Sequence, residues 1–153
     1  MNDLIERLEK ATGPDREIDG LIYGYLNGLK RNGGTFQVGD NFQFEHPTKR
    51  FPNGPAALYV RDDAVHEFTS SLDAALTLVP EGWIWDVSST GCAWIMPRND
   101  LNGQLVIGGI EHPAIAMCIA AIQARAALKT GYPHVVENTE SDQLFDGAKN
   151  QVT

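Results

Sequence analysis

Residues 83–110 read WIWDVSSTGCAWIMPRNDLNGQLVIGGI, and this stretch decides the fold. Its apolar and aromatic residues gather in three short runs, at 83–87, 93–96 and 104–110. The segments between these runs are rich in Ser, Thr, Asn, Asp and Gly, the residues that favour tight turns. Short apolar runs joined by such turns are typical of an antiparallel β-meander. We therefore predict three adjacent antiparallel strands at the centre of a sheet.

Helical patterns flank the meander on both sides. Residues 113–129, PAIAMCIAAIQARAALK, are apolar almost all round, which predicts a deeply packed helix. Its expected core residues are Ile115, Cys118, Ile119 and Ile122. Further helices are predicted over residues 2–12, from Pro14 to about 29, and over 70–79 with Ser70 as the cap. The predicted fold is α+β, with a mainly antiparallel sheet that helices cover on both faces.

The domain organisation follows from these elements. Residues 1–132 are predicted to form a single domain, and the polar residues 133–153 a loosely attached tail. Within the domain, residues 29–68 are a loop-rich insert. Alternating apolar residues in this insert predict short strands around 36–38 and 42–44, and another at 57–60.

Three glycines recur every four residues along the second helix, at Gly20, Gly24 and Gly28. One interpretation is a weak helix face exposed to solvent, since each glycine costs a helix about 1 kcal/mol relative to alanine. The other is a smooth seam where a second backbone or a ligand approaches closely. On the second interpretation the chain would form a homo-oligomer, most simply a homodimer.

The net charge and the distribution of apolar residues limit which partners the protein can bind and where in the cell we expect it. The chain has 153 residues and a net charge of −8, which repels nucleic-acid phosphates, so we expect no binding of bulk nucleic acid. The N-terminus lacks the apolar stretch of a signal peptide, and no apolar run is long enough to span a membrane. We therefore expect a cytoplasmic protein without membrane contact.

The chain has two cysteines, Cys92 and Cys118, and we expect both to be reduced core residues.

Motifs for catalysis or metal binding do not emerge from the sequence. The histidines are scattered, and none has the spacing of metal ligands. The signatures of serine hydrolases, zinc proteases and phosphate-binding loops are missing. We expect no cofactor, no metal and no catalytic residues, and a binding role is favoured over an enzymatic one.

Aromatic and basic residues are the best candidates for a binding site. Trp83 and Trp85 are two residues apart, so they share one face of a strand, and Trp94 lies on the next strand. Such rings can form a stacking platform for a planar ligand, although tryptophans in a core are more common. A cation beside them could hold a phosphate, so a small anionic nucleotide could bind. The candidate cations are Lys49, Arg50, Arg61 and Arg98.

Three segments carry a family resemblance: LEKATGPDREID at 8–19, SLDAALTLVPEGW at 71–83, and HPAIAMCIAAIQARAAL at 112–128. Together with the meander, they resemble a small family of bacteriophage and prophage proteins of unknown function, the phage ABA sandwich domain. The resemblance covers about two thirds of the ordered chain and leaves the insert at 29–68 unmatched. Its motifs are helix caps and core faces, so it transfers no site residues.

The resemblance implies a phage accessory protein that acts by binding. Its partner would be a host protein, or a signalling nucleotide that it sequesters, in a role that counteracts or commandeers a host component (anti-defence). The alternatives are a small enzyme that acts on a nucleotide and a structural or assembly protein of the virion.

Overall fold

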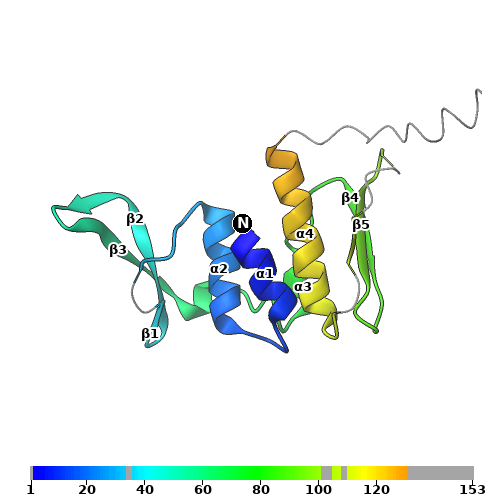
Figure 1. Cartoon of the computed structure of the whole chain (residues 1–153), viewed down its shortest axis with the longest axis horizontal. Coiled ribbons are helices and arrows are strands. Elements are labelled where there is room, and N and C mark those ends of the chain that lie inside the picture. The colour runs from blue at the N-terminus through cyan, green and yellow to red at the C-terminus, as the bar shows by residue number, and fades with distance from the viewer. Residues whose placement is uncertain (1, 34–35, 101–104, 108–109, 131–153) are drawn as a thin grey trace, which may run out of the picture.

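The computed structural model describes residues 2–33, 36–100, 105–107 and 110–130 (Figure 1). The predicted tail at 133–153 lies outside these residues. Four α-helices, one short 3-10 helix and six strands follow one another along the described chain. Their bounds are α1 Asn2–Lys10, α2 Arg16–Asn27, β1 Gln37–Val38, β2 Asn41–Phe51, β3 Gly54–Arg61, η1 Asp62–Ala64, α3 Leu72–Leu76, β4 Trp83–Val87, β5 Ala93–Pro97, β6 Leu105–Ile107 and α4 Pro113–Lys129.

The predicted meander is confirmed. β4 pairs antiparallel with β5, from Trp83 opposite Pro97 to Val87 opposite Ala93. β5 pairs antiparallel with β6, and the strand order is β4-β5-β6. Positions 104, 108 and 109 of the predicted third strand lie outside the described residues. The α+β class and the antiparallel pairing therefore follow the sequence prediction.

Helix α4 forms the core against this sheet. Ile115, Cys118, Ile119 and Ile122 are all fully buried, as the apolar pattern predicts. They belong to a cluster that also contains Leu8 of α1, Ile22 of α2 and Ile95 of β5. Among the described residues, no helix is long and apolar enough to cross a membrane.

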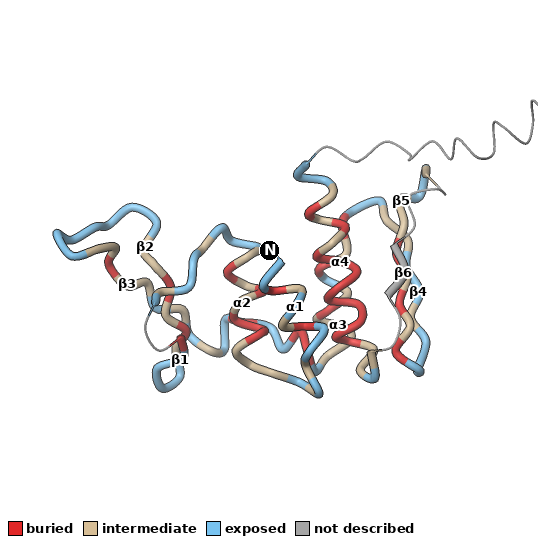
Figure 2. Tube along the Cα trace, viewed as in Figure 1, coloured by how far each residue is buried: buried red, intermediate tan, exposed pale blue. Residues whose placement is uncertain are grey.

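The layers differ from the expected arrangement. Figure 1 shows α1, α2 and α4 in the middle, with the β4–β6 sheet at one end of the long axis and the β1–β3 sheet at the other. The buried residues concentrate where helices and sheets meet (Figure 2). In the described residues, helices therefore pack against one side of the meander, and a second helical layer is not seen there.

Two helices begin later than predicted, because side chains next to them act as the caps. The carboxylate of Asp15 accepts the backbone N–H groups of Glu17 and Ile18, so α2 begins at Arg16 rather than at Pro14. The hydroxyl of Ser71, not Ser70, accepts the N–H of Ala74 and caps α3. Each cap satisfies backbone donors that have no partner inside the helix.

The insert at 29–68 contains far more sheet than predicted. β2 has 11 residues and β3 has 8, and they form one long antiparallel hairpin. The two-residue strand β1 pairs with the start of β2. A second buried cluster lies beneath this sheet and consists of Phe36, Phe42, Phe44 and Val65.

Gly20 and Gly24 of α2 form a seam of close approach, as the second interpretation predicts, but the neighbour is β2 of the same chain. A Cβ at Gly20 would lie 2.6 Å from ring carbons of Phe42, and one at Gly24 would lie 2.7 Å from the ring of Phe44. Gly28 is the C-cap, in the left-handed conformation with φ 65°. Gly20 and Gly24 are therefore neither solvent-exposed nor an interface between copies, because the phenylalanines of β2 already fill this seam.

Candidate functional site

Within the part of the chain that the structure describes, the most connected polar cluster joins α2 to the segment that follows β3. The side chain of Asp19 is 1% exposed. Its carboxylate accepts the backbone N–H of Thr69 at 2.7 Å and a guanidinium N–H of Arg16 at 3.1 Å. Burial raises the pKa of Asp19, and the hydrogen bonds from Thr69 and Arg16 act in the opposite direction.

Arg16 has its donors fully occupied in this cluster. It contacts the Asp62 carboxylate at 2.9 Å and donates to the carbonyl groups of Asp62, Val65 and His66. Burial acts to lower the pKa of Arg16, but its hydrogen bonds and charge interactions with Asp62 and Asp19 outweigh burial and raise it. A surface pocket lies beside this guanidinium. The N–H groups of the Arg16 guanidinium already have partners within the chain, so we interpret the cluster as structural. We call this cluster of Arg16, Asp19, Asp62 and Thr69 the latch.

The two cysteines have different environments. The Cys118 thiol is fully buried and donates to the carbonyl of Phe68, and burial raises its pKa far above the usual range. Cys92 is half-buried at the β4–β5 turn, where its backbone N–H donates to the hydroxyl of Ser88. The expectation of two core cysteines therefore holds for Cys118 only, and both thiols are free.

The tryptophans do not form one platform. Residues opposite each other in an antiparallel pair point to the same face. Trp85 lies opposite the buried Ile95, so Trp83 and Trp85 occupy strand positions on the face toward α4. Trp94 lies opposite Asp86 and therefore on the other face. Trp83 packs against the main core, Trp94 is half-buried, and Trp85 is 42% exposed.

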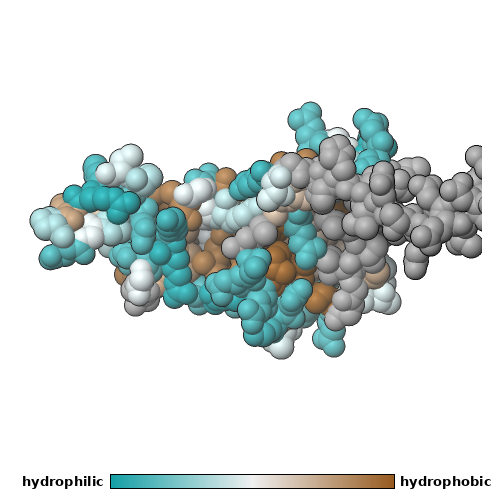
Figure 3. Space-filling view, turned by 45° about the horizontal axis from the view of Figure 1, so that its top comes forward, coloured by the Kyte–Doolittle hydropathy of each residue, from teal (hydrophilic) through white to brown (hydrophobic). Residues whose placement is uncertain are grey.

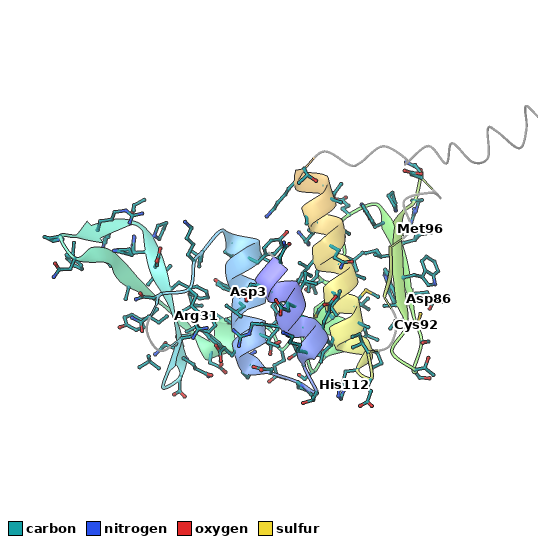
Figure 4. All side chains as sticks on the ribbon, in the orientation of Figure 1. Asp3, Arg31, Asp86, Cys92, Met96 and His112 are labelled. Atoms are coloured by element: carbon teal, nitrogen blue, oxygen red, sulfur yellow. The ribbon has the colours of Figure 1, made fainter. Side chains whose placement is uncertain are left out.

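Three of the four predicted cations are separated from these rings. Arg98 follows β5, and its backbone N–H donates to the carbonyl of Gly82, next to Trp83. Lys49, Arg50 and Arg61 belong to the β2–β3 hairpin at the opposite end of the molecule (Figure 1). In Figure 4, Asp86 and Met96 mark the tryptophan-bearing sheet, and Arg31 marks the side of the β2–β3 hairpin. The structure thus does not join tryptophan and these three cations in one site.

The hairpin itself has the most distinctive exposed surface. We call β2 and β3 together, residues 41–61, the arm, and residues 46–55 the arm tip. Pairing is regular as far as Glu45 opposite Ala57 and resumes at Arg50 opposite Pro55. Four residues of β2 thus bulge out against one residue of β3. The ring Nδ1 of His46 accepts the backbone N–H groups of Thr48 at 3.2 Å and Lys49 at 3.0 Å, which fixes the bulge.

The arm tip extends beyond the second core. From Glu45 to Phe51 the strand can project on the order of 15–20 Å. Residues 47–53 are all exposed (Figure 2), and the outer end of the arm is largely hydrophilic (Figure 3). Phe51 is 68% exposed there, directly after Lys49 and Arg50. Among the described residues, neither of these two cations forms an ion pair.

Sequence reasoning found the cations of the arm and missed its aromatics. Phe51 and Tyr59 are 68% and 57% exposed, and neither was among the predicted site residues. A usable signal was present, since Pro52-Asn53-Gly54-Pro55 is a turn sequence between two strand-like runs. It indicates a hairpin whose end carries Phe51. The charge pattern adds to this signal, because residues 46–61 contain three cations and no acidic residue.

Comparison with known proteins identifies no relative, because no family model, no curated protein and no solved structure matches the chain. The candidate site therefore rests on the geometry of the arm. Among the described residues, no three side chains of His, Cys, Asp or Glu group as metal ligands.

Proposed function

We propose that this protein acts by binding another protein, and that the arm is its recognition element. The observation that carries the proposal is the exposure of Phe51, at 68%, on a projecting two-stranded ribbon. Beside it stand Lys49 and Arg50, which form no ion pair with any residue that the structure describes. Burial of one phenylalanine side chain on binding is worth about 1.5–3 kcal/mol. Aromatic residues and arginine are also the residue types that most often dominate binding energy at protein interfaces.

The charge distribution supports an acidic partner surface. The chain as a whole carries −8, yet the arm tip carries Lys49 and Arg50 without an acidic neighbour in residues 46–55. A local positive patch on a negative protein attracts an anionic partner in one orientation and repels it in others. Arm tip and body thus differ in the sign of their charge, which favours docking by the tip.

A binding role accords better with the ionisable residues than a catalytic one does. Asp19, the most buried carboxylate among the described residues, and the guanidinium of Arg16 are held in the latch between α2 and the segment after β3. A catalytic acid or base must reach a substrate, whereas these groups already have hydrogen-bond partners within the chain. The proposed nucleotide site likewise loses support, because Lys49, Arg50 and Arg61 lie away from the tryptophans (Figure 1).

The biological setting that we propose is based on the resemblance of three sequence segments to phage proteins. In that setting, the bound protein is a bacterial host component that a phage-encoded accessory protein counteracts or commandeers. The cytoplasm of the host cell is then where binding takes place.

The experiment compares affinity capture from a bacterial lysate by three forms of the protein. The tip variant carries Lys49→Glu, Arg50→Glu and Phe51→Ser. The matched control carries changes of the same chemistry at exposed positions outside the arm, namely Lys10→Glu, Lys30→Glu and Leu128→Ser. We expect the wild type and the control to retain the same proteins, and the tip variant to lose them at least tenfold. Equal retention by the tip variant would contradict the proposal.

A further inference from the structure

Strand β3 presents an open edge. It is the last strand of its sheet, and among the described residues nothing pairs with its outer side. Residues 54–60, GPAALYV, carry no charge. Proteins usually protect such edges with charged side chains, prolines or bulges, because an open edge accepts additional strands. β3 has two such devices, one at each end: Pro55 near the tip and the charged Arg61 at the base.

The hydrogen bonds of β2 show which backbone groups of β3 face outward. Gln43 donates its N–H to the carbonyl of Phe36, and Glu45 donates its N–H to the carbonyl of Lys30. Both groups therefore point away from β3. In an antiparallel pair, opposite residues either exchange hydrogen bonds or both point away from each other. The partners of Gln43 and Glu45 are Tyr59 and Ala57, so their N–H and C=O groups point to the open edge.

The same alternation sets the length of the usable edge. Arg61, two residues beyond Tyr59, also directs its backbone groups outward, as does Pro55 in the other direction. Proline has no N–H, so an added strand gains donors only from Ala57, Tyr59 and Arg61. These three residues span about five positions, which matches a short extended peptide. Tyr59 is 57% exposed beside this edge and offers a ring for the side chains of that peptide.

The charges along the arm define the direction of such a peptide. The tip end of β3 lies beside Lys49 and Arg50, because Arg50 is opposite Pro55. The base end lies beside Asp40, Asp62 and Asp63, which line one surface pocket together with Arg61. Arg61 itself pairs with Asp63 at 2.7 Å. Acidic residues of a bound peptide are therefore favoured at the tip and opposed at the base.

From this edge and these charges we propose that the arm binds its partner by strand addition. The ligand is an extended protein segment that pairs antiparallel with residues 57–61 and places carboxylates at its C-terminal end beside Lys49 and Arg50. This inference rests on the proposed function and specifies the class of partner. The backbone of a nucleic acid cannot pair with a strand edge, and the acidic base of the arm repels its phosphates.

The test is calorimetric titration with designed probes. The first probe is the blocked peptide TVTVTEE, with N-terminal acetyl and C-terminal amide groups, and the second is TVTVTKK. A single-stranded deoxythymidine oligonucleotide serves as the third. We expect TVTVTEE to bind roughly tenfold more tightly than TVTVTKK, as two exposed charge pairs allow. We expect no binding of the oligonucleotide.

Two sets of variants separate the tip from the edge. Lys49→Glu with Arg50→Glu should reverse the preference, so that TVTVTKK binds more tightly than TVTVTEE. Ala57→Pro removes an outward N–H without removing a bond to β2, and should weaken both peptides at least tenfold. Ala57→Ser keeps that N–H and should bind both peptides at least tenfold more tightly than Ala57→Pro does. Should Ala57→Pro not fold, slowed hydrogen exchange of the Ala57 and Tyr59 amides in the wild type under saturating TVTVTEE supports strand addition, and unchanged exchange overturns it.

The outcomes distinguish this inference from the function on which it rests. Loss of binding in the charge-reversed tip, together with unchanged binding in a folded Ala57→Pro variant, overturns strand addition and leaves the arm as a recognition element. Binding of the oligonucleotide in preference to TVTVTEE overturns the peptide as the ligand. Binding of TVTVTEE that neither variant weakens overturns both proposals, and so does the absence of binding by all three probes.

Discussion

The body and the arm tip differ in what lies beneath their apolar residues. In the body, formed by α1, α3, α4 and the β4–β6 sheet, apolar side chains from several elements enclose one another around α4. In the arm tip, residues 47–53 are all exposed, and the apolar Phe51 has no such enclosure. Helix α2 stands between the two regions. The comparison indicates that the body holds the fold while the tip is available for recognition.

The largest effect is expected at the centre of the body. Ile119 is fully buried in α4, so Ile119→Asp would place an unpaired charge in an apolar interior. We expect the free energy of unfolding to fall by about 4 kcal/mol or more. Urea denaturation measures this, with the exposed Leu128→Asp on the same helix as the control. A loss below about 1 kcal/mol would show that α4 is not the core of the body.

The next effect concerns the latch, the cluster of Arg16, Asp19, Asp62 and Thr69 that joins α2 to the segment after β3. Asp19→Ala leaves the buried N–H of Thr69 without its acceptor and removes one partner of Arg16. A buried polar group that loses its partner costs about 1–3 kcal/mol, and we expect a loss of about 3 kcal/mol because a charged pair is also broken. Thermal and urea unfolding check this. A stability equal to that of the wild type would refute the latch.

The loss of stability caused by Asp19→Ala should decrease as the pH rises. The pKa of Asp19 is raised from its usual 3.8 in the folded chain, mainly by burial. Between that value and the raised one, the folded state holds more protons than the unfolded state, so stability falls as the pH rises. The loss caused by Asp19→Ala should therefore be greatest near pH 4 and decrease toward neutral pH. A loss that increases over this range would contradict the assigned cause.

A smaller effect is expected at the seam between α2 and β2. Alanine is favoured over glycine in a helix by about 1 kcal/mol, but a Cβ at Gly20 would lie 2.6 Å from the buried ring of Phe42. Overpacking costs about 1–3 kcal/mol, so we expect Gly20→Ala to destabilise by about 1–2 kcal/mol. A double-mutant cycle with Phe42→Leu checks the cause. Additive losses would show that this contact is not responsible.

The body was largely predictable from the sequence because its patterns are local. The meander follows from apolar runs and turns, and the burial of α4 follows from a helix that is apolar all round. Which residues pack against Gly20 and Gly24 could not be inferred, because their neighbours Phe42 and Phe44 lie in a strand distant in sequence. Helical periodicity identifies the apolar stripe of α2, but it does not show what packs against the glycine face opposite that stripe.

The candidate site was predictable only in part. The cations Lys49 and Arg50 were identified by their type, but pairing them with Trp83, Trp85 or Trp94 required knowledge of which sheet each strand joins. Pairing of β2 with β3 sends the cations to one end of the molecule, and pairing of β4 with β5 keeps the tryptophans at the other (Figure 1). Exposure of Phe51 is equally a property of the tertiary structure.

Deletion of the arm tip should have the smallest effect on stability, and it tests most directly whether the body alone holds the fold. Residues 45–57 are replaced by Asn-Gly, a turn that suits closure on the pair Phe44 and Leu58 and keeps the phenylalanine cluster. The measurement is the free energy of unfolding in urea. We expect one cooperative transition within about 1.5 kcal/mol of the wild type, because the removed residues carry almost no core. A loss of about 3 kcal/mol or more, or a non-cooperative transition, would show that the tip supports the fold and would contradict its assignment to recognition.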